Sequence, residues 1–296
     1  MAPALKAAFW MAGAIASFSS MALAGREVTR SLSTFELMFY RSAIGLVLVL
    51  GWAALGPGLA RLATRRPGLH LARNLSHFAG QNFWFYAIAT IPLAQVVAFE
   101  FTTPLWVALL APIFLHERLT ARRAVAVLIG FCGMLLVARP GPDGVSAGMI
   151  AALCAALGFA GSALATKRLT ATEPVWRILF WLALMQLVFS ALIVGRDLHV
   201  PWPAPGLWPF LVVIGITGLT AHLCLTSALA TAPAVIVMPI DFLRLPTVAI
   251  LGMIFYDEPL VAIVFIGAGI IFAANLANLR AEIRGIGAPA RAGRGA

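Results

Sequence analysis

The feature that most restricts this chain is a series of long apolar stretches without any charged residue. One of them, residues 198–240, runs for 43 residues, and several others exceed 18. A helix needs about 20 apolar residues to cross the hydrocarbon core of a bilayer. Hydrophobic residues make up 61% of the chain and charged residues 11%, whereas about 25% of residues are charged in soluble domains. The sequence therefore predicts an all-α integral membrane protein and excludes ordinary soluble classes.

Proline and glycine positions divide these stretches into ten transmembrane helices. The longest stretch begins with a Pro-rich loop at 201–206 and is punctuated near its end by Thr231 and Pro233. The stretch before residue 100 breaks in the same way at Thr90 and Pro92. We expect helices at residues 5–25, 34–56, 69–89, 92–114, 123–138, 146–166, 175–194, 207–229, 233–255 and 259–279.

The charges are unequal: 21 Lys and Arg against 11 Asp and Glu give a net charge of +10. Such a surplus suggests nucleic acid in a soluble protein, but here it follows the loops. With the N-terminus inside, the inner segments carry 14 basic residues and the outer segments carry 4. Because cytoplasmic loops are enriched in Lys and Arg, both termini are predicted to be cytoplasmic. We expect a multi-pass protein of the inner membrane of a bacterium, with no nucleic acid partner.

The second half of the chain repeats the first. A shift of 141 residues gives 13 identities over the 33 positions 87–119 and 228–260, including Pro92/Pro233 and Phe101/Phe242. The match extends upstream through Phe18/Phe159. Since each unit has five helices, the second unit enters the membrane from the opposite side, and the two are related by a pseudo-two-fold axis in the membrane plane. Inverted repeats of this kind are typical of transporters.

The closing segments Ile113-Phe-Leu-His-Glu-Arg-Leu119 and Ile254-Phe-Tyr-Asp-Glu-Pro-Leu260, together with the five-plus-five plan, resemble the EamA family of the drug/metabolite transporter superfamily. The resemblance covers essentially the whole chain. It implies one EamA-like repeat at residues 1–139, a second at 142–280, and a basic, flexible cytoplasmic tail at 281–296. It also implies a central cavity lined mainly by helices 1, 3, 4, 6, 8 and 9 that opens alternately to each side.

Two acidic residues, Glu100 and Asp241, occupy equivalent positions in the repeats. Each follows a helix-starting proline by eight residues, so each lies about 12 Å into a core of about 30 Å. An ionisable group at that depth costs roughly 2.5–3.5 kcal/mol on insertion scales and is a functional candidate for binding substrate or a coupling proton. Arg244 follows Asp241 by three residues and can pair with it. Whether that pair is structural or part of the site stays open.

A polar stripe on the third helix includes His77 and Gln81, which share one helical face. Gln81 is equivalent to His222 in the second repeat, so we expect these three side chains to face the bundle interior, as substrate contacts or as links between helices. Arg41 lies near the outer end of the second helix, and we expect its side chain to snorkel outward.

Aromatic and proline residues complete the candidate site. Six aromatic residues fall on helices expected to line the cavity: Phe18, Phe159, Trp84, Phe101, Trp106 and Phe242. Ordinary packing is the alternative explanation for them. Three prolines, Pro104, Pro239 and Pro246, are expected to kink their helices near the two acids.

The main expectation is a secondary-active or facilitative transporter of small organic metabolites that works by alternating access and exports an amino acid or related compound. Uptake of a vitamin or nucleoside-like metabolite is the alternative within this class, and a passive channel or an integral-membrane enzyme comes from other classes. No HExxH, GxSxG or P-loop motif occurs, and Cys132, Cys154 and Cys224 form no CxxC pair. We therefore expect no enzyme, no cofactor and no metal site. The expected partners are a small-molecule substrate, the lipid bilayer and protons as a candidate coupling ion, in a monomer or homodimer.

Overall fold

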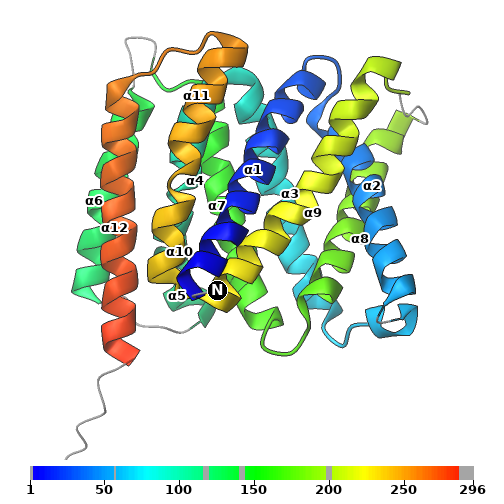
Figure 1. The fold of residues 1–296 in the computed structure, drawn as a ribbon, viewed down its shortest axis with the longest axis horizontal. Coiled ribbons are helices and arrows are strands. Elements are labelled where there is room, and N and C mark those ends of the chain that lie inside the picture. Colours follow the sequence, from blue (N-terminus) through cyan, green and yellow to red (C-terminus); the bar gives the residue numbers. More distant parts are fainter. Residues whose placement is uncertain (1–2, 57, 116–119, 140–143, 198–201, 287–296) are drawn as a thin grey trace, which may run out of the picture.

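A computed structural model describes the chain except for residues 1–2, 57, 116–119, 140–143, 198–201 and 287–296 (Figure 1). The described part is helical, which confirms the predicted fold class. Its α-helices are α1 (Pro3–Thr29), α2 (Thr34–Leu55), α3 (Pro67–Thr90), α4 (Leu93–Glu100), α5 (Thr103–Leu115), α6 (Ala121–Ala138), α7 (Ala147–Leu169), α8 (Val175–Val194), α9 (Trp208–Thr231), α10 (Ala234–Asp241), α11 (Arg244–Tyr256) and α12 (Ala262–Ile286).

Ten membrane crossings account for these helices. Within the described residues, nine segments are long and apolar enough to span a bilayer when α4 is joined to α5 and α10 to α11. The tenth crossing is α3, which has the required length but carries many polar residues. Those side chains are buried inside the bundle: His70, Arg73, Asn74, His77, Gln81 and Asn82. Polar groups at membrane depth are tolerated where protein covers them, so α3 is the helix most dependent on its neighbours.

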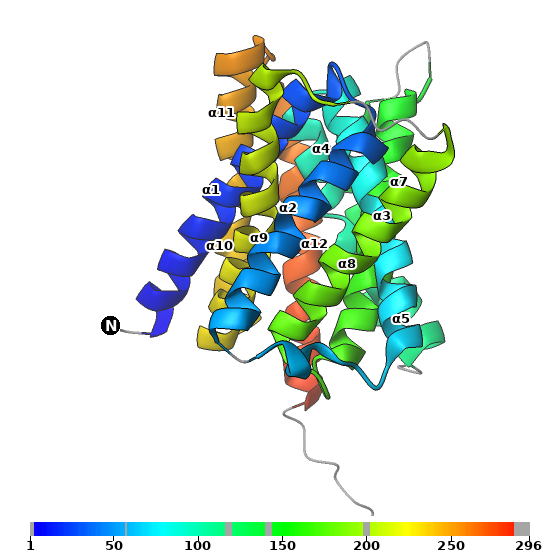
Figure 2. The ribbon, with the colours of Figure 1, turned by 90° about the vertical axis from the view of Figure 1, so that its right-hand side faces the viewer.

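The packing of the helices follows the repeat. α1 packs on α9 and α3 packs on α7, and the shift of 141 residues exchanges these two pairs. Two further contacts join equivalent helices, α2 with α8 and α6 with α12, while α4 packs on α11, the repeat equivalent of α5. The α2–α8 pair lies at one edge of the molecule and the α6–α12 pair at the other (Figures 1 and 2). The central helices between these edges are therefore free to surround a cavity.

Glycines allow the closest of these contacts, as predicted. A Cβ atom at Gly158 of α7 would lie 2.8 Å from the Cα atom of Gly80 on α3. On the α6–α12 seam, a Cβ atom at Gly133 would lie 2.7 Å from the carbonyl oxygen of Gly267. Since backbone atoms cannot move aside cheaply, these seams require glycine. By contrast, Gly51 on α2 has open space around it.

The fourth and ninth crossings each consist of two helices separated by a two-residue break. α4 ends at Glu100 and α5 begins at Thr103, while α10 ends at Asp241 and α11 begins at Arg244. Pro104 and Pro246 lie in the first turns of α5 and α11, where a missing backbone N–H is tolerated; Pro239 lies inside α10. The expected kinks coincide with these two-residue breaks, whose backbone stays close to helical, because Pro104 and Pro246 each leave the carbonyl four residues earlier without a helical donor.

The start of α1 and the end of α12 lie on the same side of the bundle, the lower side in Figure 1. We call this the terminal side, and the basic-residue count predicts that it faces the cytoplasm. α12 continues to Ile286, so the first residues of the expected flexible tail, 281–286, are helical, and the rest of the tail lies outside the described residues.

A buried carboxylate fixes the turn after α7 to α3 on the terminal side. Glu173 Oε2 lies 2.6 Å from His70 Nε2, and the Thr64 hydroxyl donates to the other carboxylate oxygen. Burial raises the pKa of Glu173, but the hydrogen bonds from Thr64 and His70 and the charges of His70 and Arg177 bring the pKa below its ordinary value. The ionised form of Glu173 is therefore the one that the fold stabilises.

Candidate substrate-binding cavity

A cavity of about 690 Å³ lies between the central helices. Its volume falls within the range of about 300–1,000 Å³ that is usual for small-molecule sites. Residues from α1, α3, α4, α5, α7, α9 and α10 line it, which agrees with the lining implied by the family resemblance; α12 adds Phe272 and Asn275. The cavity also reaches Lys167 and Thr170, which are exposed at the terminal-side end of α7. It therefore opens toward the terminal side.

The guanidinium of Arg244 joins the two repeat-related acids in the wall of this cavity. Arg244 Nη1 donates to Glu100 Oε1 at 2.7 Å, and Nη2 donates to Asp241 Oδ2 at 3.4 Å. Trp84 Nε1 donates to the second oxygen of Glu100 at 3.1 Å. The predicted Asp241–Arg244 pair is present. The contact of Arg244 with Glu100 could not be predicted from local spacing, because the two residues are 144 positions apart. We call Glu100, Asp241 and Arg244 the charge triad.

Aromatic rings shield the charge triad from solvent. The guanidinium carbon of Arg244 lies 4.7 Å from the ring centroid of Phe18 and 5.1 Å from that of Phe101, distances at which cation–π attraction operates. Arg244 is only 4% exposed. A buried cation held by two carboxylates and two rings is fixed in position, so the triad is a rigid polar centre in an otherwise apolar bundle.

The breaks in the two crossings place the acids. Glu100 is the last residue of α4 and Asp241 the last residue of α10, so each carboxylate stands just before the N-terminus of the following helix. The partial positive charge of a helix N-terminus favours nearby carboxylates. Broken helices at membrane depth are typical of binding sites in inverted-repeat transporters. Asp241 Oδ1 has no hydrogen-bond partner within the described part of the chain.

The two predicted histidines pack against each other beside Phe18, and Gln81 lines the same cavity. The ring centroids of His77 and His222 lie 5.7 Å apart, and His222 packs edge-on against Phe18 at 5.9 Å. Phe159, the repeat equivalent of Phe18, lies 5.6 Å from His77. All of these residues line the cavity. His77 Nε2 and Gln81 Oε1 are buried and have no partner among the described residues, so the histidine nitrogen can accept or donate a hydrogen bond, and the amide oxygen can accept one, from a ligand or water.

Five of the six predicted aromatic residues line the cavity, and Trp106 does not. Trp106 packs edge-on against Phe131 of α6 with ring centroids 4.8 Å apart. The cavity face of α5 follows Thr103, Val107 and Ala111, and one residue along a helix turns the side chain by about 100°. The expectation for Trp106 was therefore wrong, because it was based on which helix lines the cavity and not on which face of that helix points into it.

Three phenylalanines form a continuous stack across the repeat boundary. Phe101 and Phe242 are repeat equivalents, and their ring centroids lie 5.4 Å apart with an interplanar angle of 30°. Phe272 of α12 extends the stack, 4.6 Å from Phe242. Asn275 donates to the carbonyl of Phe101 at 2.7 Å, which ties α12 to the break after α4. Asn275 also lines the cavity.

Two arginines differ from their expected positions. Arg41 does not snorkel: it is 6% exposed, and its guanidinium points to α9, where a Cβ atom at Gly218 would lie 2.7 Å from Nη2. Arg73, one of the 14 basic residues assigned to the inner segments, lies in the second turn of α3 and is buried in the cavity wall. Its spacing of four residues from His77 was the available signal.

The side opposite the cavity mouth is closed by an ion pair between Arg26 and Glu258. Arg26 at the end of α1 also donates to the carbonyls of Ile88 and Ile91. Glu258 accepts from the backbone N–H of Leu93 at 2.9 Å. This network, which we call the latch, joins the ends of α1, α3, α4 and α11. The repeat equivalents of its two charges are Lys167 and Glu117, and Glu117 lies outside the described residues.

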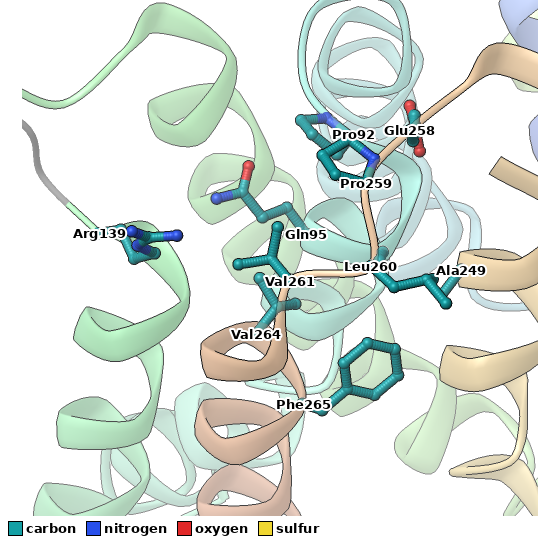
Figure 3. Close-up of a pocket in the computed structure, with 11 residues that line it drawn as sticks. Pro92, Gln95, Arg139, Ala249, Glu258, Pro259, Leu260, Val261, Val264 and Phe265 are labelled. Carbon is teal, nitrogen blue, oxygen red and sulfur yellow. The ribbon is translucent and has the colours of Figure 1, made fainter. Parts of the chain in front are cut away.

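Further contacts tighten the same closure. Tyr256 Oη donates to the carbonyl of Leu23 at 3.1 Å. Figure 3 shows Glu258 and Pro259 beside Pro92, above a pocket of about 70 Å³ that also contains Gln95. This pocket is too small for a metabolite of the size that the central cavity accepts. The protein is thus open to the terminal side and closed to the other.

Comparison with known proteins agrees with this architecture. The model of the EamA-like transporter family matches twice, at residues 5–139 and 146–279. A riboflavin transporter of Brucella anthropi is 32% identical over 83% of this chain and 88% of that protein. An S-adenosylmethionine uptake transporter of Rickettsia bellii is 26% identical over 84% of each chain. A pseudopaline exporter of Pseudomonas aeruginosa is 28% identical over 90% of this chain and 93% of that protein.

Members of this family are transporters rather than enzymes. The protein studied here is a multi-pass small-molecule transporter of the bacterial inner membrane, and its chain belongs to the EamA-like transporter family.

Proposed function

We propose that this transporter takes up a planar, aromatic metabolite of the vitamin or nucleoside-like class. The observation that carries the proposal is the Phe101–Phe242–Phe272 stack, which forms an apolar wall of the cavity next to hydrogen-bonding groups. A flat ring system can stack on phenylalanine while its edge contacts Gln81 or His77. Amino-acid export, the first expectation from sequence, makes no use of such an extended flat wall.

The relatives favour the same class of substrate. The riboflavin transporter of Brucella anthropi and the S-adenosylmethionine uptake transporter of Rickettsia bellii are each named after a compound that contains a fused heteroaromatic ring system. We therefore infer a flavin or purine derivative as the first substrates to test. Uptake proceeds by alternating access: opening of the latch admits substrate from outside, and the conformation described here releases it on the terminal side.

The charge triad is proposed to couple this movement to protons. The triad contains two carboxylates and one guanidinium, so it has one uncompensated negative charge when both acids are ionised. Loss of one carboxylate charge, on Glu100 or on Asp241, would leave Arg244 paired with the other acid. The triad can thus change charge without stranding a buried cation. Besides its triad partners, Glu100 contacts Trp84, and the cavity also contains His77, His222 and Arg73.

Transport into liposomes that contain the purified protein tests this proposal. Labelled riboflavin, S-adenosylmethionine, adenosine and a panel of amino acids would be offered with and without an inward proton gradient. We expect accumulation of a ring-containing compound and little of the amino acids without a ring. Phe242→Leu should lower the apparent affinity roughly two- to tenfold, as expected for an aromatic contact of about 0.5–1.5 kcal/mol. Accumulation of aliphatic amino acids alone would refute the proposed substrate class.

Export remains the second candidate for direction, because the pseudopaline exporter of Pseudomonas aeruginosa is a relative over nearly the whole chain. Everted membrane vesicles distinguish the two directions. An exporter accumulates substrate in everted vesicles when the proton gradient is maintained, whereas an importer accumulates it only in right-side-out vesicles. A passive channel accumulates substrate in neither.

A further inference from the structure

Arg73 is a buried cation in the cavity wall that no acidic residue neutralises. It is 5% exposed and lines the central cavity. Its Nε donates to Thr166 Oγ1 at 3.1 Å, and its Nη1 donates to Asn74 Oδ1 at 2.9 Å. Both acceptors are neutral. Within the described residues, no carboxylate oxygen lies within 4 Å of the Arg73 guanidinium.

The two neutral partners fix the orientation of Arg73 and leave donors unused. Asn74 Nδ2 donates to the carbonyl of Trp181 at 3.2 Å, and Thr166 Oγ1 donates to the carbonyl of Ser162 at 2.8 Å. Asn74 and Thr166 are thus held by the backbones of α8 and α7. A guanidinium has five N–H donors, and these contacts account for two. The remaining donors are in a fixed geometry that suits the two oxygens of a carboxylate or phosphate.

Comparison with the other buried arginines shows that Arg73 is different. Arg244 lines the same cavity but is held by two carboxylates. Arg41 is buried beside α9 and does not line the cavity. Arg73 alone among these three combines a cavity position with the lack of an acidic partner. An unpaired buried charge is costly, and an anion that enters the cavity would remove that cost.

The position of Arg73 separates it from the charge triad along α3. Trp84, which contacts Glu100, follows Arg73 by eleven residues on α3, a rise of about 16 Å. Lys167 and Arg123 also line the cavity at the end near Arg73. The cavity therefore has a basic end near its mouth and an acidic excess at its deep end, next to the phenylalanine stack. An elongated molecule with a ring at one end and an anion at the other matches this polarity.

We propose that Arg73 is the residue that binds an anionic group, carboxylate or phosphate, of a substrate whose ring lies against the phenylalanine stack. This proposal rests on the proposed function for the ring and adds the charge of the substrate. It makes Arg73 a determinant of specificity: the transporter prefers the anionic member of a pair of compounds that share one ring system.

The test uses matched pairs as competitors of transport and as stabilisers of the purified protein against heat. Riboflavin with riboflavin 5′-phosphate and adenosine with adenosine 5′-monophosphate examine phosphate, and nicotinamide with nicotinate examines carboxylate. We expect the unmodified protein to bind an anionic member more tightly. Arg73→Gln should weaken that member about 10- to 100-fold, as expected for a hydrogen-bonded charge contact, and change the neutral member less than about twofold.

Controls separate the role of Arg73 from general effects. Arg30→Gln removes an exposed charge on the opposite side, where the side chain is 61% exposed, and should leave every pair unchanged. Arg73→Lys keeps the charge but loses the paired N–H donors, so it should retain part of the preference and provides a folded comparison if Arg73→Gln is unstable. Equal binding of both members by the unmodified protein, or a preference that survives intact in Arg73→Gln, would overturn the proposal.

Inorganic phosphate distinguishes failure of this proposal from failure of the proposed function. Phosphate has no ring, so it can bind Arg73 even when no flavin or purine binds. Heat stabilisation by phosphate over chloride at equal ionic strength, lost in Arg73→Gln, would support the anion site; if no ring compound binds in the same assay, the ring class alone is refuted. Ring compounds that bind without any preference for anions would refute the anion site alone.

Discussion

Arg244→Gln should destabilise the protein more than any other single change in the charge triad. Arg244 donates to Glu100 at 2.7 Å and to Asp241 at 3.4 Å. The side chains of the two acids are 17% and 13% exposed. Without the guanidinium, both carboxylates face each other in a poorly hydrated cavity wall, and water can compensate them only in part.

The expected magnitude follows from the burial of the pair. Removing one partner of a buried ion pair costs about 3–5 kcal/mol, because the remaining charge loses its compensation. Glu100→Gln is the matched comparison. It leaves Arg244 paired with Asp241, and the amide oxygen can accept from Arg244 or from Trp84 but not from both, because an NH2 group replaces the second carboxylate oxygen. The cost should be about 1–3 kcal/mol. The asymmetry arises because the triad carries one surplus negative charge.

Thermal unfolding in detergent, followed by the fraction of protein that stays monodisperse after heating, measures these differences. Arg244→Gln should lose its folded form at a clearly lower temperature than Glu100→Gln. A triple variant, Glu100→Gln with Asp241→Asn and Arg244→Gln, removes all three charges and should recover most of the lost stability. Equal stability of Arg244→Gln and the parent protein, or a larger loss in Glu100→Gln, would refute the reasoning.

Four further substitutions test other parts of the structure. Glu258→Gln weakens the latch. In a protein whose native cysteines are replaced and whose Met21 is changed to cysteine, a membrane-impermeant thiol reagent on the side opposite the cavity mouth should therefore react faster with position 21. An unchanged rate would show that this ion pair does not close that side. Glu173→Gln should lower the unfolding temperature at pH 7, because the ionised carboxylate has a lowered pKa. This stability begins to fall below the ordinary pKa of Glu, about 4.3, and is lost as the pH passes below the lowered pKa, so the gap between the two proteins should narrow steadily through acid pH. A gap that does not narrow would contradict the assignment. Gly158→Val should destabilise the protein by about 1–3 kcal/mol through a clash with the backbone of α3. Gly51→Ala, whose new methyl group lies in open space, should be neutral or stabilise the protein by about 0.5–1 kcal/mol. The same thermal assay compares the two variants, and equal effects would refute the packing argument.

The fold could be predicted from the sequence because a bilayer permits few alternatives. A backbone in hydrocarbon must satisfy its hydrogen bonds within the segment, so apolar length and prolines fixed the crossings to within a few residues. The repeat then specified the symmetry, and the pairing of α1 with α9 and α3 with α7 follows it. The terminal residues of α1, α7 and α12 extend beyond the expected ends because helices continue past the apolar region.

The candidate site could be predicted only in part. Equivalence in the repeat identified Glu100 and Asp241, since a pair of acids at matching depth is rare without a cause. The contact of Glu100 with Arg244 depends on how α4 and α11 approach each other, which no local pattern encodes. The same holds for Arg41, whose side chain can point inward only because Gly218 leaves space for it. It also holds for Arg73, whose proposed role depends on the shape of the cavity.

Counterflow in liposomes tests most directly whether the charge triad is the centre of an alternating-access carrier. Liposomes loaded with excess unlabelled riboflavin, or with the ring compound that the substrate panel selects, would be diluted into buffer that contains a trace of the labelled compound. We predict a transient accumulation of label with the parent protein and with the exposed control Arg30→Gln, and none with folded Arg244→Gln. Label that equilibrates without a transient excess would indicate a channel, and full counterflow by Arg244→Gln would contradict a central role for the triad.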